Sequence, residues 1–297
     1  MRVILLGTGA ALPDPDRCHT SILITLANGR HFLLDCGHGA TRQLMRVDVN
    51  PAEIERVLLT HLHHDHVCEL PFFVISGWIL SRPGTLPIHG PRGTQAMVGH
   101  LFEGGAFDAD IRARAAYPLR QQNIAAVRPQ VSEYDVGVVY QDADVTISAD
   151  AVDHIPPDLS PCFGFRIEAE GKVVVFSGDT KPCDGIARLA QGADLLIHEC
   201  TFTEDFIEHR RKSAVGTFAH TSPSDLGRLA VSAGIKNLIA THIGHVDSTS
   251  PVLKRTAGKH LPVDKMGPHQ IDAFVDQIRS VYKGPLRIAH DLMRVDL

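Results

Sequence analysis

The run HLHHDH, which places four histidines and one aspartate between His61 and His66, constrains this 297-residue chain more than any other feature. It comes one residue after the apolar run IERVLL, a pattern typical of a buried β-strand. Side chains two residues apart in an extended backbone point the same way, so we expect His61 and His63 to face one point. A helix start there would turn Asp65 and His66 toward the same region. The segment is thus predicted to feed two neighbouring metal ions, with His64 pointing away.

Three further candidate ligands stand where other predicted strands end. His154 closes DVTISADAVDH, Asp179 closes KVVVFSGDT, and His242 closes NLIATH. Neutral imidazole and carboxylate are the usual nitrogen and oxygen ligands of divalent ions. Two ions held about 3.5–4 Å apart can activate a bridging water and clamp the attacking and leaving oxygens. The predicted sets are His61, His63 and His154 for one ion, Asp65, His66 and His242 for the other, and Asp179 as the bridge.

Composition narrows the class of protein. Apolar residues make up 44% of the chain and charged residues 21%, which is ordinary for a globular protein. No run approaches the roughly 18 apolar residues of a membrane span, and the opening MRVILLG is too short for a signal peptide, so we expect a cytoplasmic protein and no membrane partner. The six cysteines form no CxxC pair, which favours reduced thiols. A net charge of -5 gives no general basic surface for nucleic acid.

Short predicted strands alternate with helices in both halves of the chain, which favours a layered α/β fold. We expect one domain over residues 1–297, built from two similar halves at about 1–144 and 145–297. A buried helix is predicted over 67–80 and another over 269–282. Residues 104–122 are predicted to be irregular, and Pro- and Gly-rich stretches at 155–162 and 243–268 to be long loops.

These motifs together resemble the metallo-β-lactamase superfamily, and the resemblance covers essentially the whole chain. It implies a four-layer αββα sandwich with metals in a cleft at one edge. HLHHDH, His154, Asp179 and His242 match all the ligand positions of the dinuclear hydrolases in that superfamily. The resemblance also implies that Asp35, in LLDCG, orients a ligand or its water.

Within the superfamily the chain looks most like ribonuclease Z, the tRNA 3′-processing endonuclease. LLGTGAALPDPDR resembles its opening glycine turn, THLHHDHVCELPF its metal loop, and LLIHECTF with AHTSPSD its HEATF and HST motifs. The resemblance implies that His220 lies beside the metals and that Glu199 orients it, an arrangement suited to a general acid. Asp65 could also accept a proton during the reaction.

The departures from ribonuclease Z concern the substrate. The usual bacterial enzyme inserts a long arm that grips tRNA, whereas GFRIEAE and VVVFSGDT are joined here by little more than GKV. The run of two serines, an arginine and a tyrosine after the last ligand is replaced by IGHVDS. An extra segment follows from Thr249 to Lys283, and the ending IAHDLMRVDL resembles small-molecule hydrolases of this branch. Together with the negative charge, these departures favour a small-molecule substrate over nucleic acid.

The sequence therefore predicts a hydrolase with two divalent ions, zinc by preference, although manganese or iron also fits. The preferred reaction is phosphodiester hydrolysis by a hydroxide that bridges the ions. One alternative is a hydrolase of an aryl sulfate, lactone, ester or β-lactam. Another is a tRNA 3′-processing endoribonuclease in which Thr249 to Lys283, or a dimer partner, takes the role of the arm. The resemblance also implies a homodimer.

Overall fold

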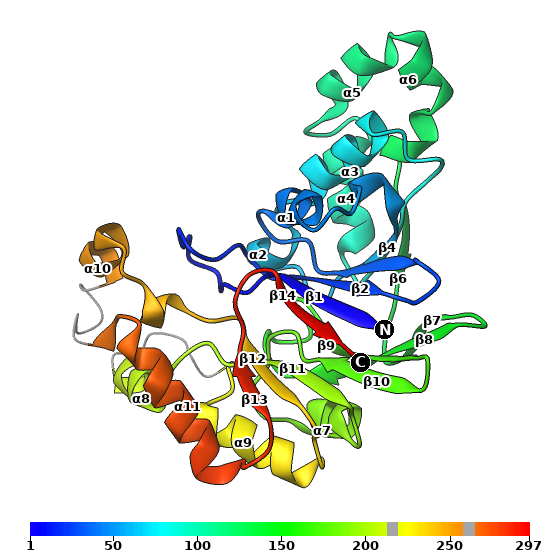
Figure 1. Ribbon diagram of the computed structural model, residues 1–297. Coiled ribbons are helices and arrows are strands. Elements are labelled where there is room, and N and C mark those ends of the chain that lie inside the picture. Colours follow the sequence, from blue (N-terminus) through cyan, green and yellow to red (C-terminus); the bar gives the residue numbers. More distant parts are fainter. Residues whose placement is uncertain (213–218, 258–264) are drawn as a thin grey trace. The chain divides into compact units, whose positions relative to one another are not determined.

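The computed structural model describes residues 1–212, 219–257 and 265–297 (Figure 1). The chain folds into two compact units. The first comprises residues 1–7, 19–134 and 292–296, and the second comprises residues 8–18, 135–291 and 297. The single domain expected over 1–297 stays a prediction. In the described part of the chain, no helix has both the length and the hydrophobicity that a membrane crossing needs.

A seven-stranded mixed sheet forms the centre of the first unit. Its order is β14-β1-β2-β3-β4-β5-β6. The pairs from β14 to β3 are antiparallel, and those from β3 to β6 are parallel. The strands are β1 (Arg2–Gly7), β2 (Ser21–Thr25), β3 (His31–Leu34), β4 (Ile54–Leu58), β5 (Pro87–Gly90), β6 (Gln130–Glu133) and β14 (Met293–Asp296).

Side chains of the first sheet and of the helices of the first unit form a shared hydrophobic core. Leu33 and Val57 from the strands join Phe73 and Trp78 from α3 in one buried cluster. The helix predicted over 67–80 is thus confirmed, although it begins at Leu70 after a separate short turn of helix. The helices are α1 (Ala40–Arg46), α2 (His64–Val67), α3 (Leu70–Ile79), α4 (Thr94–Phe102), α5 (Asp108–Ala115) and α6 (Pro118–Gln122), with 3₁₀ turns η1 (Pro51–Glu53) and η2 (Ile124–Val127).

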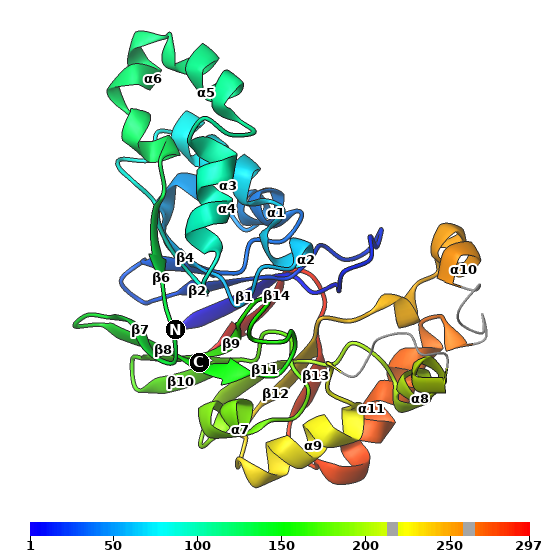
Figure 2. The ribbon, with the colours of Figure 1, turned by 180° about the vertical axis from the view of Figure 1, so that it is seen from behind.

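The prediction that residues 104–122 are irregular is wrong, because α5 and α6 lie there. Asp108 pairs with Arg112 at 2.8 Å and Asp110 with Arg114 at 2.9 Å, each four residues apart on one helix. Pro118 occupies the first turn of α6, where its missing N–H costs nothing. Both views show α5 and α6 beyond α3 and α4, away from the sheet (Figures 1 and 2).

The second unit has its own seven-stranded sheet, in the order β13-β12-β11-β10-β9-β8-β7. The pairs from β7 to β10 are antiparallel, and those from β10 to β13 are parallel. The strands are β7 (Gly137–Gln141), β8 (Val145–Val152), β9 (Cys162–Ala169), β10 (Lys172–Phe176), β11 (Leu195–Glu199), β12 (Leu238–Thr241) and β13 (Leu286–Ile288).

Helices α7, α9 and α11 lie along one face of the second sheet (Figures 1 and 2). Leu226 of α9 and Phe274 of α11 are fully buried in the cluster between these helices and the sheet. Helix α11 confirms the helix predicted over 269–282. The helices are α7 (Asp184–Ala190), α8 (Glu204–Lys212), α9 (Pro223–Ser232), α10 (Pro251–Ala257) and α11 (His269–Val281), with the 3₁₀ turn η3 (His245–Asp247).

Two predictions about connections have different outcomes. The tight turn between β9 and β10 is confirmed: Glu170 and Gly171 close it with φ of 56° and 69°. The long loop predicted over 243–268 is wrong in part, because η3 and α10 lie within it. Residues 258–264 of that loop, and of the extra segment Thr249 to Lys283, lie outside the described residues.

Candidate metal centre

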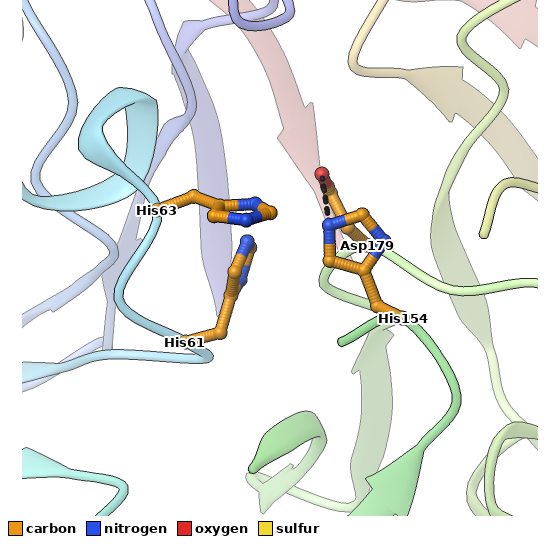
Figure 3. A group of neighbouring side chains, drawn as sticks. All are labelled: His61, His63, His154 and Asp179. Carbon is orange, nitrogen blue, oxygen red and sulfur yellow. Dashed lines mark ion pairs between the residues drawn. The ribbon is translucent and has the colours of Figure 1, made fainter. Parts of the chain in front are cut away.

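The histidine run of the first unit starts just beyond the end of β4. His61 and His63 lie on the connecting loop, with ring centroids 4.8 Å apart (Figure 3). Helix α2 then brings His66 to 4.1 Å from His61, again between ring centroids. The Nε2 of His66 is 3.6 Å from Oδ2 of Asp65. The structure therefore brings these four side chains close together, whereas the side chain of His64 is 67% exposed.

A buried carboxylate orients two of these histidines. Asp35 accepts a 2.7 Å hydrogen bond from Nδ1 of His66 and a 2.9 Å bond from the hydroxyl of Thr60. The same hydroxyl lies 3.0 Å from Nδ1 of His61 and accepts from it. Burial raises the pKa of Asp35, and the neighbouring His66 and Thr60 partly offset that rise. Asp35 thus fixes His66 directly and His61 through Thr60. In each ring Nδ1 makes this supporting contact, and Nε2 is the nitrogen on the opposite side.

In the second unit, two histidines converge on one carboxylate oxygen. Oδ2 of Asp179, in the turn after β10, lies 3.6 Å from Nε2 of His154 and 3.2 Å from Nε2 of His242 (Figure 3 draws the first pair). The opposite ring nitrogens are also engaged. Nδ1 of His154 donates to the carbonyl of Ala219 at 3.0 Å, and Nδ1 of His242 lies 2.9 Å from the hydroxyl of Thr201. Both rings therefore present Nε2 to Asp179.

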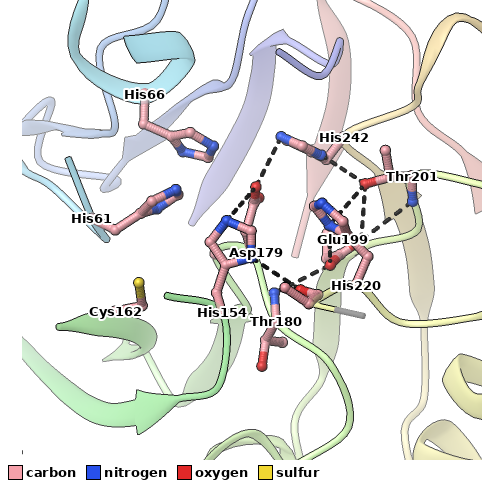
Figure 4. A network of polar contacts seen from close by, with 12 residues as sticks. His61, His66, His154, Cys162, Asp179, Thr180, Glu199, Thr201, His220 and His242 are labelled. Atoms are coloured by element: carbon pink, nitrogen blue, oxygen red, sulfur yellow. Dashed lines mark hydrogen bonds and ion pairs between the residues drawn. The ribbon is translucent and has the colours of Figure 1, made fainter. Parts of the chain in front are cut away.

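Glu199 repeats in the second unit the role that Asp35 has in the first. Its side chain is fully buried at the end of β11. One carboxylate oxygen accepts from Nδ1 of His220 at 2.8 Å, and the other accepts from the hydroxyl of Thr201 at 3.0 Å (Figure 4). Since Thr201 in turn contacts His242, one carboxylate holds two histidine rings.

The ion pair between Glu199 and His220 sets the charge of both groups. Burial alone would lower the pKa of His220, but the Glu199 carboxylate outweighs it and raises that pKa to about 9. Burial would raise the pKa of Glu199, and the His220 charge and hydrogen bond more than offset this, so the pKa of Glu199 is lowered. His220 is therefore protonated at neutral pH, with its Nε2 as the position from which a proton can leave.

The donor set in each unit fits a divalent metal ion. Four histidines use Nδ1 for an oxygen partner, which is the tautomer that leaves Nε2 as the ligand atom in metal sites. Two donors that are each about 2.1 Å from a common zinc ion lie about 3–3.5 Å apart. The separations in both units, 3.6 Å from Asp65 to His66 and 3.2 Å from Asp179 to His242, are close to this range.

Thr60 and Thr201 each connect a buried carboxylate to a histidine ring, and we call them the two threonine relays. Neither relay was predicted from the sequence. Thr60 stands next to His61, and Thr201 lies two residues after Glu199, so their proximity to a ligand gave a weak signal. What they connect depends on contacts 25 and 41 residues apart, Thr60 with Asp35 and Thr201 with His242. No regular spacing in the sequence predicts contacts between residues so far apart along the chain.

Replacing Asp35 with asparagine is expected to weaken metal binding about 10–100-fold, the usual cost of losing such a supporting carboxylate. The neutral amide no longer stabilises the His66 ring by charge or accepts equally well from Thr60. Metal affinity is measured by competition with a chromophoric chelator. Asp48→Asn is the matched control, because Asp48 is exposed and, like Asp35, has a left-handed φ. Equal affinities in the two variants would contradict this role for Asp35.

Comparison with known proteins agrees with the fold and with these motifs. A family model described as Anti-Pycsar protein Apyc1 matches residues 1–218. Ribonuclease Z from Mycobacterium bovis (strain BCG / Pasteur 1173P2) is 34% identical over 303 residues, covering 100% of this chain and 98% of the relative. The chain belongs to the Anti-Pycsar protein Apyc1 family and to the ribonuclease Z-like hydrolases of the metallo-β-lactamase fold. As a member of these families, it is a metal-dependent hydrolase.

Solved structures confirm the fold expected for the family. YhfI from Bacillus subtilis, described as a metallo-β-lactamase fold protein, superposes with a TM-score of 0.71 at 21% identity and covers 99% of this chain and 98% of its own. Human tRNase Z, short form, gives a TM-score of 0.67 at 21% identity and covers 100% and 99% of the two chains. At these identities the likeness shows the fold alone. The predicted α/β class and the ribonuclease Z-like branch are both confirmed.

Proposed function

We propose that this hydrolase is a dinuclear phosphodiesterase that acts on a small substrate. His61, His63 and His154 are assigned to one ion, Asp65, His66 and His242 to the other, and Asp179 to both. Zinc is the preferred metal because the set is rich in imidazole, and manganese or iron would also be accepted by its carboxylates. Bound divalent ions would supply Lewis acidity to the phosphoryl oxygens and lower the pKa of a water molecule.

The observation that carries this proposal is the ion pair between Glu199 and His220, which places the His220 ring against that of His242. Cleavage of a phosphodiester releases an alkoxide, which is a poor leaving group unless it receives a proton. His220 holds that proton, and its ring stacks 5.9 Å from the ring of His242. Glu199 keeps His220 oriented and charged through their 2.8 Å contact. We assign His220 as the general acid, Glu199 as the group that positions it, and Asp65 as a group that could accept a proton.

The proposal of a small substrate rests on charge more than on the missing arm. The Mycobacterium bovis relative aligns with this 297-residue chain over 303 residues, a difference of six (303 − 297), so it too has no room for a long insertion. The tight β9–β10 turn therefore distinguishes this chain from ribonuclease Z enzymes that carry the tRNA-binding arm, but not from the Mycobacterium bovis relative. A net charge of -5, by contrast, opposes the many phosphate contacts that tRNA binding needs. The homodimer implied by the resemblance stays a prediction.

A substrate panel tests the proposal and its alternatives. The metal-loaded protein is assayed with a bis-aryl phosphate, cyclic nucleotides, an aryl sulfate, a lactone, a cephalosporin and a tRNA precursor. We expect the phosphodiesters of low molecular weight to give the highest kcat/KM. Efficient trimming of the tRNA 3′ trailer would reject the small-substrate proposal. Turnover of the sulfate, lactone or cephalosporin alone would reject phosphodiester hydrolysis.

A further inference from the structure

A polar cavity of about 610 Å³ lies beside His220 in the second unit. Residues of α8, of the start of α9 and of the turn after β10 line it together with His220. Sites for small molecules usually have volumes of about 300–1,000 Å³, so this cavity is large enough to hold part of a substrate.

The ring of His220 connects this cavity to the candidate metal ligands of the second unit. Its centroid lies 5.1 Å from that of His154 and 5.9 Å from that of His242, and its Nδ1 donates to Glu199 (Figure 4). A general acid delivers its proton to the oxygen of the leaving alcohol over hydrogen-bond distance. The rest of that alcohol therefore has to lie next to His220, and the cavity offers the space for it.

The arginine and lysine side chains of the cavity are each paired with a carboxylate. The pairs are Arg228 with Asp225 at 2.6 Å, Lys181 with Asp153 at 2.9 Å and Arg211 with Glu208 at 3.6 Å. Glu204 and Asp205 add two further carboxylates to the lining. A leaving group that carries more phosphates, such as an RNA strand, would bring like charges together and is disfavoured.

The lining also favours a hydroxyl-bearing group over an apolar one. Ser222 and Ser224 contribute hydroxyls, and that of Ser222 donates to Asp225 at 2.7 Å. Among the described residues, Pro182 and Ile207 are the apolar part of the lining. An alkyl or aryl group would take water from the polar atoms without replacing its hydrogen bonds. A hydroxyl can donate to a carboxylate and accept from a cation, so it matches this mixed lining.

We propose that this cavity receives the leaving alcohol of the substrate, and that this alcohol is a neutral polyol. The inference rests on the proposed phosphodiesterase function and names the leaving group at the same site. One water molecule is consumed: its oxygen bonds to phosphorus, the P–O bond to the polyol breaks, and the polyol oxygen takes the proton from Nε2 of His220. The other hydroxyls of the polyol donate to carboxylates such as Glu208 and accept from cations such as Arg228.

The test compares methyl phosphodiesters that differ in the second alcohol, which is glycerol, 2-methoxyethanol or glycerol phosphate. In the metal-loaded protein, we expect kcat/KM for the glycerol diester to exceed that for each of the other two about tenfold, the gain from one or two net hydrogen bonds. The glycerol diester should release glycerol and methyl phosphate rather than methanol and glycerol phosphate. Product analysis by NMR measures this preference within a single substrate.

A variant that fills the cavity tests where the polyol lies. Ser224→Trp places a large apolar ring in the lining, so the ratio of kcat/KM for the glycerol diester to that for dimethyl phosphate should fall about tenfold. Ser280→Trp, at an exposed position of α11, is the matched control and should keep the wild-type ratio. A general loss of activity or of metal cancels in this ratio. If Ser224→Trp does not fold, the smaller change Ser224→Leu takes its place.

The outcomes separate the inference from the function on which it rests. Equal kcat/KM for the glycerol and 2-methoxyethanol diesters would overturn the polyol assignment and leave phosphodiester hydrolysis intact. An unchanged ratio in a folded Ser224 variant would overturn the assignment of the cavity. If wild type hydrolyses none of the diesters, the proposed function fails, and the inference fails with it.

Discussion

Removal of divalent ions with a chelator is expected to abolish hydrolysis, with a fall in kcat/KM of more than about 10⁴-fold. By our assignment, the residues that hold the ions bind and orient them, and none of these side chains attacks the substrate itself. Without the ions, the site therefore has no activated nucleophile. His220 can deliver a proton but cannot by itself activate water, because its pKa of about 9 keeps it protonated. Restoring zinc or manganese should recover the activity, which is followed with the best phosphodiester of the panel.

Thermal unfolding of the chelated protein provides the control for this experiment. The hydrogen bonds that Asp35 and Glu199 accept from His66 and His220 hold these rings without the ions, so the metal-free protein should remain folded. Full hydrolytic activity in a folded, metal-free preparation would contradict the assigned chemistry.

Replacing His220 with alanine is expected to lower kcat for an alkyl phosphodiester about 10²–10⁴-fold, the usual contribution of a general acid. Metal content should change little, because His220 is assigned to the proton and not to an ion. An aryl diester with an acidic leaving group needs less help from a proton donor, so its kcat should fall less. His100→Ala is a matched control on an exposed histidine of α4.

The same residue predicts how hydrolysis depends on pH. The pKa of His220 is raised to about 9, so the acid form is fully present well below pH 9 and is lost as the pH rises through that value. We expect kcat of wild type to decline on the alkaline side with a midpoint no higher than about pH 9, because bound divalent ions would lower this pKa, and His220→Ala to lose this decline. An unchanged alkaline limb in His220→Ala would assign it to another group.

The candidate ligands of the second unit could be proposed from sequence for a physical reason. Parallel and antiparallel strands that end at one sheet edge bring their terminal residues together, so His154, Asp179 and His242 could be recognised one strand at a time. The structure places Asp179 after β10 and His242 after β12, two strands of the second sheet that are separated by β11, with Oδ2 and Nε2 3.2 Å apart. The threonine relays could not be recognised, because Thr60 and Thr201 act through contacts that no local period encodes.

The helices around the site were harder to predict than the strands. Helix α8 carries EDFIEHRRK, of which only Phe206 is buried, so its apolar pattern is too sparse to signal a helix. This is the helix that places Arg210 against the rings of Phe202 and Phe206. The short α5 and α6 were missed for the same reason, since ion pairs and Pro118 stabilise them more than a continuous apolar face does.

The metal content of the purified chain tests the central claim most directly. The protein is dialysed against excess zinc, freed of loosely bound ions by gel filtration, and analysed by inductively coupled plasma mass spectrometry. The two ligand sets joined by Asp179 predict two ions per chain, and Asp179→Ala should retain fewer. A wild-type chain that holds one ion or none after this treatment would contradict the dinuclear site.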